Sequence, residues 1–92
     1  MACAEIYTTA VCPYCVAAKM FLKQKGCDYT EVRVDREPGR LQEMLERSGG
    51  RRTVPQVFIN GVYVGTYDEM VAADRSGRLK DLLENPGTGD SA

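Results

Sequence analysis

Apolar residues recur with two different periods along the first half of the chain. Residues 4–9 are rich in β-branched and aromatic side chains, and residues 29–35 alternate between apolar and charged positions, so both segments are predicted to be strands. Residues 15–25 carry apolar side chains at helical spacing and end at Gly26, where a helix C-cap belongs. The apolar stripe expected on this helix is Val16, Met20 and Phe21. Two strands joined through a helix are expected to be parallel, with a right-handed crossover.

A β-hairpin is the sharpest local prediction in the second half of the chain. The apolar runs 57–59 and 62–64 flank the dipeptide Asn60-Gly61. A two-residue hairpin turn needs a positive φ at both central positions, which asparagine and glycine tolerate best. The two runs are therefore predicted to pair as antiparallel strands.

Two further helices are predicted in the same half. The earlier one shows the i, i+3, i+4 spacing of a helix face and is expected to end at the run 48–50. The later one covers about residues 68–83, with a break near Ser76-Gly77. The expected apolar stripe of the earlier helix is Leu41, Met44 and Leu45.

The elements follow one another in the order β-α-β-α-β-β-α. This order predicts an α/β fold in which helices flank a mixed sheet of four strands. The 92 residues fit a single domain. We place that domain at residues 1–85 and expect residues 86–92, rich in glycine and small polar side chains, to form a flexible C-terminal tail.

Composition narrows the classes of function. The net charge of −1 argues against nucleic-acid binding, which usually needs a basic surface. The chain has no histidine, which excludes Ser-His and Cys-His catalysis and histidine metal sites. Its apolar runs are far shorter than the roughly 20 residues that span a membrane. No secretory leader is visible, so we expect a cytoplasmic protein whose thiols are kept reduced.

The four cysteines divide into a close pair and two isolated residues. Cys12 and Cys15 form a Cys-x-x-Cys where the first strand gives way to the first helix, and this placement favours a redox centre over half of a zinc site. No metal site is therefore expected. Cys3 and Cys27 are expected to be small buried apolar side chains without a function, although Cys27, after a helix-ending glycine, is predicted to be partly exposed and prone to side oxidation.

The position of Cys12 explains how the pair would react. The first turn of a helix has unpaired N–H groups and a partial positive charge, which stabilise a thiolate. Pro13 suits that turn because its missing N–H costs nothing there. Cys12 is therefore predicted to be the nucleophile, and Cys15, one turn farther on, the thiol that attacks a mixed disulfide on Cys12.

A second motif, taken together with the first, makes the chain resemble a known protein family. Thr53-Val54-Pro55 precedes an apolar run, and a proline there suggests an edge strand or a special peptide bond. Together with Cys12-Pro13-Tyr14-Cys15 and the segment Gly65-Thr66-Tyr67-Asp68-Glu69 after the hairpin, it resembles the glutaredoxin family over about residues 5–83.

The resemblance implies a thioredoxin fold and a site for glutathione. Pro55 would be cis and would bring Val54 beside Cys12, so that the Val54 backbone pairs with the cysteinyl part of glutathione. The γ-glutamyl carboxylate would lie on N–H groups at Asp68 and Glu69, with an acidic side chain there for the ligand ammonium. The other expected glutathione-binding residues are Tyr14 beside the sulfur, Thr53, and Arg52 and Gln42 for the glycine carboxylate, although the last two residues would also suit plain solvent exposure.

The chain departs from the family pattern at three places. Thr66 stands where a second glycine is common, and its side chain would either crowd the glutathione groove or cap the helix. Glu69 replaces the usual aspartate with a side chain one methylene longer. No lysine precedes the Cys-x-x-Cys. Because the chain also has no histidine, activation of Cys12 must come from the helix, backbone N–H groups and nearby arginine or lysine, not from a general base.

Three functions are compatible with these motifs. The leading hypothesis is a glutathione-dependent thiol–disulfide oxidoreductase that reduces protein disulfides and protein–glutathione mixed disulfides, with glutathione as reductant, no tightly bound cofactor and a monomeric state. The second is a redoxin that thioredoxin reductase supplies with electrons for ribonucleotide reductase. The third is a non-enzymatic carrier of an iron–sulfur cluster, ligated by Cys12 and glutathione, which Pro13 disfavours by family analogy.

Overall fold

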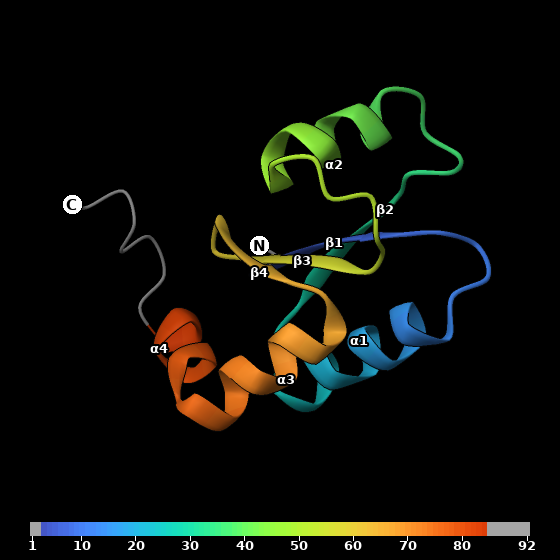
Figure 1. Ribbon diagram of the computed structural model, residues 1–92. Helices are drawn as coiled ribbons and strands as arrows, with labels where there is room; N and C mark the ends of the chain where they lie inside the picture. The colour runs from blue at the N-terminus through green and yellow to red at the C-terminus, as the bar shows by residue number, and fades with distance from the viewer. Residues whose placement is uncertain (1–2, 85–92) are drawn as a thin grey trace.

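A mixed sheet forms the middle layer of the molecule (Figure 1), and its four strands lie in the order β2-β1-β3-β4. The computed structural model describes residues 3–84. β1 pairs in parallel with β2 and antiparallel with β3, which in turn pairs antiparallel with β4. The strands are β1 (Ala4–Thr8), β2 (Tyr29–Arg33), β3 (Gln56–Ile59) and β4 (Val62–Gly65). The predicted thioredoxin-type sheet, its parallel first pair and its hairpin are confirmed.

Helices cover both faces of this sheet. In Figure 1, α2 lies alone on one face, and α1 and α3 lie together on the other. The predicted break in the last helical region is confirmed, because Gly77 adopts a φ of +87° between α3 and α4. The helices are α1 (Pro13–Gln24), α2 (Arg40–Ser48), α3 (Tyr67–Ser76) and α4 (Arg78–Glu84).

Each face of the sheet has its own apolar core. Ile6 on β1 packs toward α1 and α3 with Leu22 and Met70, and all three side chains are fully buried. Tyr7, the next residue, packs toward α2 with Met44. The central position of β1 explains why adjacent residues of a single strand are both buried.

The stripe predicted for α1 is wrong at Val16 and Met20 and right at Phe21, which packs partly buried against the core. Val16 and Met20 are 52% and 57% exposed, and the side chains that α1 buries are instead those of Cys15, Ala18 and Leu22. These residues also have helical spacing, at i, i+3 and i+7, and small side chains among them allow α1 to lie close to the sheet. The larger apolar residues were therefore a misleading guide to the buried face.

Several local predictions are corrected or refined by the structure. β3 is a central strand rather than an edge strand, so the special peptide bond is the correct reading of Pro55, and the Val54–Pro55 bond is cis. β2 ends at Arg33, two residues before the predicted end. The hairpin turn has the positive φ values expected of it, +50° at Asn60 and +85° at Gly61. The predicted tail, residues 86–92, lies outside the described residues.

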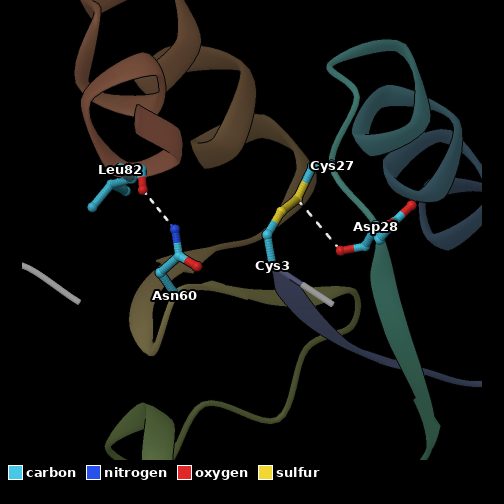
Figure 2. The surroundings of a disulfide bond; sticks show 5 residues. All are labelled: Cys3, Cys27, Asp28, Asn60 and Leu82. Carbon is cyan, nitrogen blue, oxygen red and sulfur yellow. Dashed lines mark hydrogen bonds between the residues drawn. A yellow bond between two sulfur atoms is a disulfide. The ribbon is translucent and has the colours of Figure 1, made fainter. Parts of the chain in front are cut away.

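Cys3 and Cys27 are joined by a disulfide (Figure 2), which overturns the prediction that they are isolated residues without a partner. Cys27 is also 4% exposed rather than partly exposed. Cys3 immediately precedes β1, and Cys27 shortly precedes β2. Since these strands are parallel neighbours, their N-terminal ends lie side by side at the same end of the sheet. The two cysteines, which precede these ends, therefore meet there.

Over residues 3–84, no helix is both long enough and apolar enough to cross a membrane.

Candidate active site

Cys12 occupies the N-cap of α1, directly after the loop that leaves β1. Its φ of −151° and ψ of 101° are extended, and Pro13 begins the helix. The backbone N–H of Cys15 donates to the Cys12 sulfur over 3.2 Å, as the side chain of an N-cap residue commonly accepts. The strand-to-helix placement predicted for the Cys-x-x-Cys is confirmed, and it points a helix N–H group at the sulfur of Cys12.

The two thiols of this pair lie in different environments. Cys12 is half-buried, whereas Cys15 is 2% exposed. Burial, followed by a hydrogen bond with Cys12, raises the pKa of the Cys15 thiol to about 12, although the Thr9 backbone and the charge of Lys19 act in the opposite direction. Cys15 is therefore a protonated thiol at neutral pH, held behind the more accessible Cys12.

The loop before Cys12 is held by acidic side chains from the β2 region. A carboxylate oxygen of Asp35 accepts from the Ala10 N–H over 3.1 Å, and Asp35 also pairs with Arg33. The hydrogen bond from Arg33 is the main cause that lowers the pKa of Asp35 to about 2. Glu31 likewise receives hydrogen bonds from Thr8 (2.7 Å) and Lys19 (3.0 Å). These contacts anchor both ends of the turn that presents the cysteine pair.

The segment before β3 faces Cys12. The Cys12 sulfur lies 3.9 Å from the carbonyl oxygen of Val54, the residue before the cis proline. Buried Gln56 supports this segment, because its Nε2 donates to the carbonyl oxygens of Arg51 (2.7 Å) and Thr53 (2.8 Å). The peptide of Val54 is thereby fixed beside the Cys12 sulfur.

A groove runs from this segment to the start of α3. Five residues predicted to bind glutathione line it together, and three further residues complete it, of which the sequence had singled out only Thr66. Thr66 lines the groove and is also the N-cap residue of α3, where its backbone N–H donates to Glu69 over 2.9 Å. The predicted lining residues are Tyr14, Thr53, Val54, Pro55 and Asp68, and the additional ones are Arg51, Thr66 and Tyr67.

Arg51 links the groove to α3. Its guanidinium donates to Glu69 over 2.9 Å and to the hydroxyl of Tyr63 over 3.0 Å. The hydrogen bond from the Thr66 backbone, with lesser contributions from Arg51, lowers the pKa of Glu69. The Glu69 carboxylate is thus bonded to Arg51 and Thr66 at the protein surface, where its side chain is exposed, and it does not line the groove.

Two other predicted contacts lie away from the groove. Arg52 is exposed and is not among the lining residues, although its neighbour Arg51 is. Gln42 donates to Glu46 on the exposed side of α2. Adjacent arginines cannot be told apart by sequence motif, because only the path of the loop decides which side chain turns toward α3.

The fold and this site define the class of the protein. A reactive Cys-x-x-Cys at a helix N-terminus, beside a cis proline on a thioredoxin-type sheet, is the site of a thiol–disulfide oxidoreductase. The glutaredoxin family model matches residues 4–64, about two thirds of the chain. The chain belongs to the glutaredoxin family, and it is a glutathione-dependent thiol–disulfide oxidoreductase.

Relatives and solved structures agree with this assignment. The chain is 46% identical to a glutaredoxin of Pseudomonas aeruginosa over 78 residues, which cover 85% of this chain and 92% of that protein. It is 44% identical to glutaredoxin 3 of Escherichia coli K12 over 84 residues, covering 91% of this chain and all of that protein.

The structural comparisons show the same fold. A buckwheat glutaredoxin–glutathione complex superposes with a TM-score of 0.81 at 29% identity, covering 94% of this chain and 80% of that one. The solution structure of a Brucella melitensis glutaredoxin gives a TM-score of 0.74 at 43% identity, covering 90% and 89%.

Proposed function

We propose that Cys12 is the nucleophile and Cys15 the resolving thiol of this oxidoreductase. The observation that carries the proposal is the contrast between a half-buried Cys12, backed by a helix N–H, and a buried Cys15 whose pKa is raised to about 12. The Cys12 thiolate attacks the glutathione sulfur of a mixed disulfide and releases the protein thiol. A second glutathione then attacks that sulfur, which frees Cys12 and forms glutathione disulfide.

Protein disulfides follow a dithiol route. Cys12 forms a mixed disulfide with the substrate, and Cys15 loses its proton and attacks the Cys12 sulfur. This step releases the substrate as a dithiol and leaves Cys12 and Cys15 oxidised, to be reduced by two molecules of glutathione. The short distance from the Cys15 backbone to the Cys12 sulfur, 3.2 Å, supports closure of the pair without a large backbone movement.

The groove is proposed to hold glutathione in an extended form. The Val54 backbone, 3.9 Å from the Cys12 sulfur at its carbonyl oxygen, is placed to pair with the cysteinyl residue. The γ-glutamyl carboxylate would lie at the N-terminus of α3, and the exposed Asp68 carboxylate would take the ammonium group. Glu69 would contribute to glutathione binding indirectly, by positioning Arg51 and Thr66, because its carboxylate is already hydrogen-bonded to both.

Arginine at the rim completes the proposed site. Arg51 lines the groove, so it is the better placed of the two neighbouring arginines for the glycine carboxylate, and Arg52 stays a candidate for a more peripheral contact. Tyr14, which is 60% exposed beside Cys12, would flank the reacting sulfur. We further propose a monomer acting in the cytoplasm on disulfide-containing or glutathionylated proteins, which size-exclusion chromatography and cell fractionation would test.

The cysteine variants test the assignment of roles. Reduction of a glutathionylated protein is followed with glutathione, glutathione reductase and NADPH. Cys12→Ser should abolish turnover, because the nucleophile is lost. Cys15→Ser should retain reduction of the mixed disulfide but lose reduction of protein disulfides. Turnover by Cys12→Ser would refute the proposed roles, and activity with thioredoxin reductase but not with glutathione would favour the redoxin alternative.

A further inference from the structure

A second pair of cysteines lies at the end of the sheet opposite the active site. Figure 2 shows the Cys3 and Cys27 sulfurs bonded beside the start of β2, with the β3–β4 turn and α4 close by. Cys3 precedes β1, whereas Cys12 follows the strand, and the five residues of β1 put roughly 15 Å between its ends. The two pairs therefore cannot exchange disulfides within one molecule in the folded state.

Backbone contacts hold the two cysteines together independently of the sulfur bond. The Cys3 N–H donates to the Asp28 carbonyl oxygen over 2.9 Å, and the Cys3 carbonyl oxygen accepts from the Asn60 N–H over 2.8 Å. The Cys27 N–H donates to Leu22 over 3.0 Å at the end of α1. These bonds fix a Cα–Cα separation of 5.8 Å, within the range of about 4.4–6.8 Å that disulfides require.

The same site also suits two free thiols. The Cys27 sulfur lies 3.6 Å from the carbonyl oxygen of Asp28, so a Cys27 thiol has an acceptor in place. Cys27 belongs to the apolar core between the sheet and α1, and Cys3 packs against that core. A surface hollow lined by Lys23 and Gly26 reaches Cys27, and Cys3 is itself half-exposed. Both redox states are therefore compatible with the fold, and a small thiol or disulfide has access.

We propose that Cys3 and Cys27 form a second, non-catalytic redox couple that glutathione disulfide oxidises and that stabilises the oxidised protein. The thiolate of Cys3 attacks glutathione disulfide and forms a mixed disulfide, with release of one glutathione. The Cys27 thiolate then attacks the Cys3 sulfur and displaces the second glutathione. Two protein thiols are thereby oxidised and one glutathione disulfide is reduced to two glutathione molecules, with the two protons passing to solvent or product.

The effect of forming the Cys3–Cys27 disulfide follows from the segment of chain that it encloses. The bond joins residues 24 apart in sequence and encloses β1, the Cys12–Cys15 loop and α1. Closing a loop of this length restricts the unfolded chain far more than the folded one, whose backbone already holds both ends. Oxidation is thus expected to raise the melting temperature by about 10 °C while leaving the geometry of the catalytic pair unchanged.

The test uses the full chain carrying Cys12→Ser and Cys15→Ser, so that only the second pair is able to form an internal disulfide. This variant is incubated with glutathione disulfide, and its mass, its peptide map and its melting temperature are recorded before and after. The expected result is the loss of two hydrogens, a peptide that links Cys3 to Cys27, and a melting temperature higher by about 10 °C, all reversed by excess glutathione.

A matched variant with Cys27→Ala in addition should show neither the cross-link nor the rise in melting temperature. In the otherwise unmodified chain, Cys27→Ala should retain reduction of glutathionylated protein at 25 °C, which separates the second couple from catalysis. The proposal is overturned if glutathione disulfide leaves a persistent glutathione adduct on Cys3 instead of the cross-link. It is equally overturned if the cross-linked protein melts at the same temperature as the dithiol, or if excess glutathione fails to open it.

Discussion

At the scale of single residues, burial gives the two active-site thiols different reactivities. Cys12 caps α1 and Cys15 lies in its first turn, but only Cys15 faces the core beneath the helix, together with Ala18 and Leu22. Desolvation is the largest cause of its raised pKa, ahead of the hydrogen bond with Cys12. The thiol proposed to resolve the mixed disulfide is thereby held protonated at neutral pH.

This asymmetry predicts selective alkylation. In a Cys3→Ser, Cys27→Ala background, iodoacetamide at pH 8 should modify Cys12 first, and Cys15 should react at least about tenfold more slowly because a buried thiol with a pKa of about 12 holds little thiolate. Peptide mass mapping over time measures both rates. In urea the difference between the two alkylation rates should vanish. In the Cys12→Ser variant the Cys15 thiol should still be alkylated slowly, because burial raises its pKa more than the contact with Cys12 does. Comparable rates for both thiols in the native protein would contradict this account.

The neighbouring arginines provide a second prediction at this scale. Arg51→Ala removes a cation that lines the groove and pairs with Glu69, so the KM for glutathione should rise by about fivefold or more, as expected for a charge-assisted contact of about 1–2 kcal/mol. Arg52→Ala is the matched control, and its KM should change by less than about twofold because the side chain is exposed outside the groove. Steady-state kinetics with glutathione as the varied substrate measures both. A larger rise in the KM for glutathione in Arg52→Ala than in Arg51→Ala would assign the contact with glutathione to Arg52.

At the scale of elements, the junction between β4 and α3 shapes one wall of the groove. Gly65 ends β4 with a φ of +111°, and Glu69 folds back from the first turn of α3 to meet the N–H of Thr66. A Cβ atom on Gly65 would lie only 2.2 Å from a Glu69 carboxylate oxygen. The backbone angle therefore favours a glycine here, and a Cβ atom would displace the Glu69 carboxylate from its bond with Thr66.

Substitution of Gly65 tests this junction. Gly65→Ala should destabilise the protein by about 2–3 kcal/mol and weaken glutathione binding, since Glu69 must leave Thr66 and carry Arg51 with it. Gly77→Ala, at a φ of +87° with no atom within 4 Å of the added Cβ, isolates the backbone cost and should lose only about 1 kcal/mol with an unchanged KM. Urea unfolding and glutathione kinetics distinguish the two. Equal losses of unfolding free energy in both variants would show that the close approach of Glu69 to Gly65 adds nothing to the cost of the substitution.

At the scale of the whole molecule, a network of charged groups fastens α2 to the sheet. Glu43 accepts from the Tyr7 hydroxyl and pairs with Arg40, while Arg47 donates to the same hydroxyl over 2.8 Å and lies 3.9 Å from the Phe58 ring centroid. The hydrogen bond from Tyr7 is the main cause that lowers the pKa of Glu43. Burial is the main cause that raises the pKa of Tyr7.

These shifts predict how stability depends on pH. A carboxylate whose pKa is lowered by folding stabilises the protein above its ordinary pKa, and this contribution disappears as the pH falls through the lower folded value. Glu31, Glu43 and Glu69 all have lowered pKa values, so the urea midpoint should fall as the pH drops below about 4.5. Tyr7, raised above 10.0, should cost stability as the pH rises beyond that value.

The control for this prediction is Glu43→Gln, which removes one of the titrating groups. Its urea midpoint should be lower at pH 7 and should change less between pH 5 and pH 3 than that of the unmodified chain, because part of the acid dependence has been removed. An acid dependence as steep as that of the unmodified protein would show that the contacts of Glu43 with Tyr7 and Arg40 do not contribute.

Local patterns were sufficient to predict the order of elements and the chemistry of the first motif. Alternation and helical spacing, the Asn60-Gly61 turn and the placement of Cys12 and Pro13 all act over a few neighbouring residues, where backbone preferences decide the outcome. The local motif left Pro55 open between an edge strand and a special peptide bond, and only the family resemblance specified a cis bond. Where a prediction failed, as with the buried stripe of α1, the choice between two helix faces depended on the sheet beneath it.

By itself, the sequence determined the β-α-β-α-β-β-α order, the Cys12-Pro13-Tyr14-Cys15 pair at a helix start and the family to which these motifs belong, because each depends on contacts within one turn or one hairpin. Tertiary structure decided that Arg51 lines the groove, that Glu69 pairs with Arg51, and that Cys3 meets Cys27. Those outcomes depend on how parallel strands align their ends and which way a loop turns across the sheet. Residues far apart in the chain become neighbours only when the sheet has formed, so no local pattern contains that information.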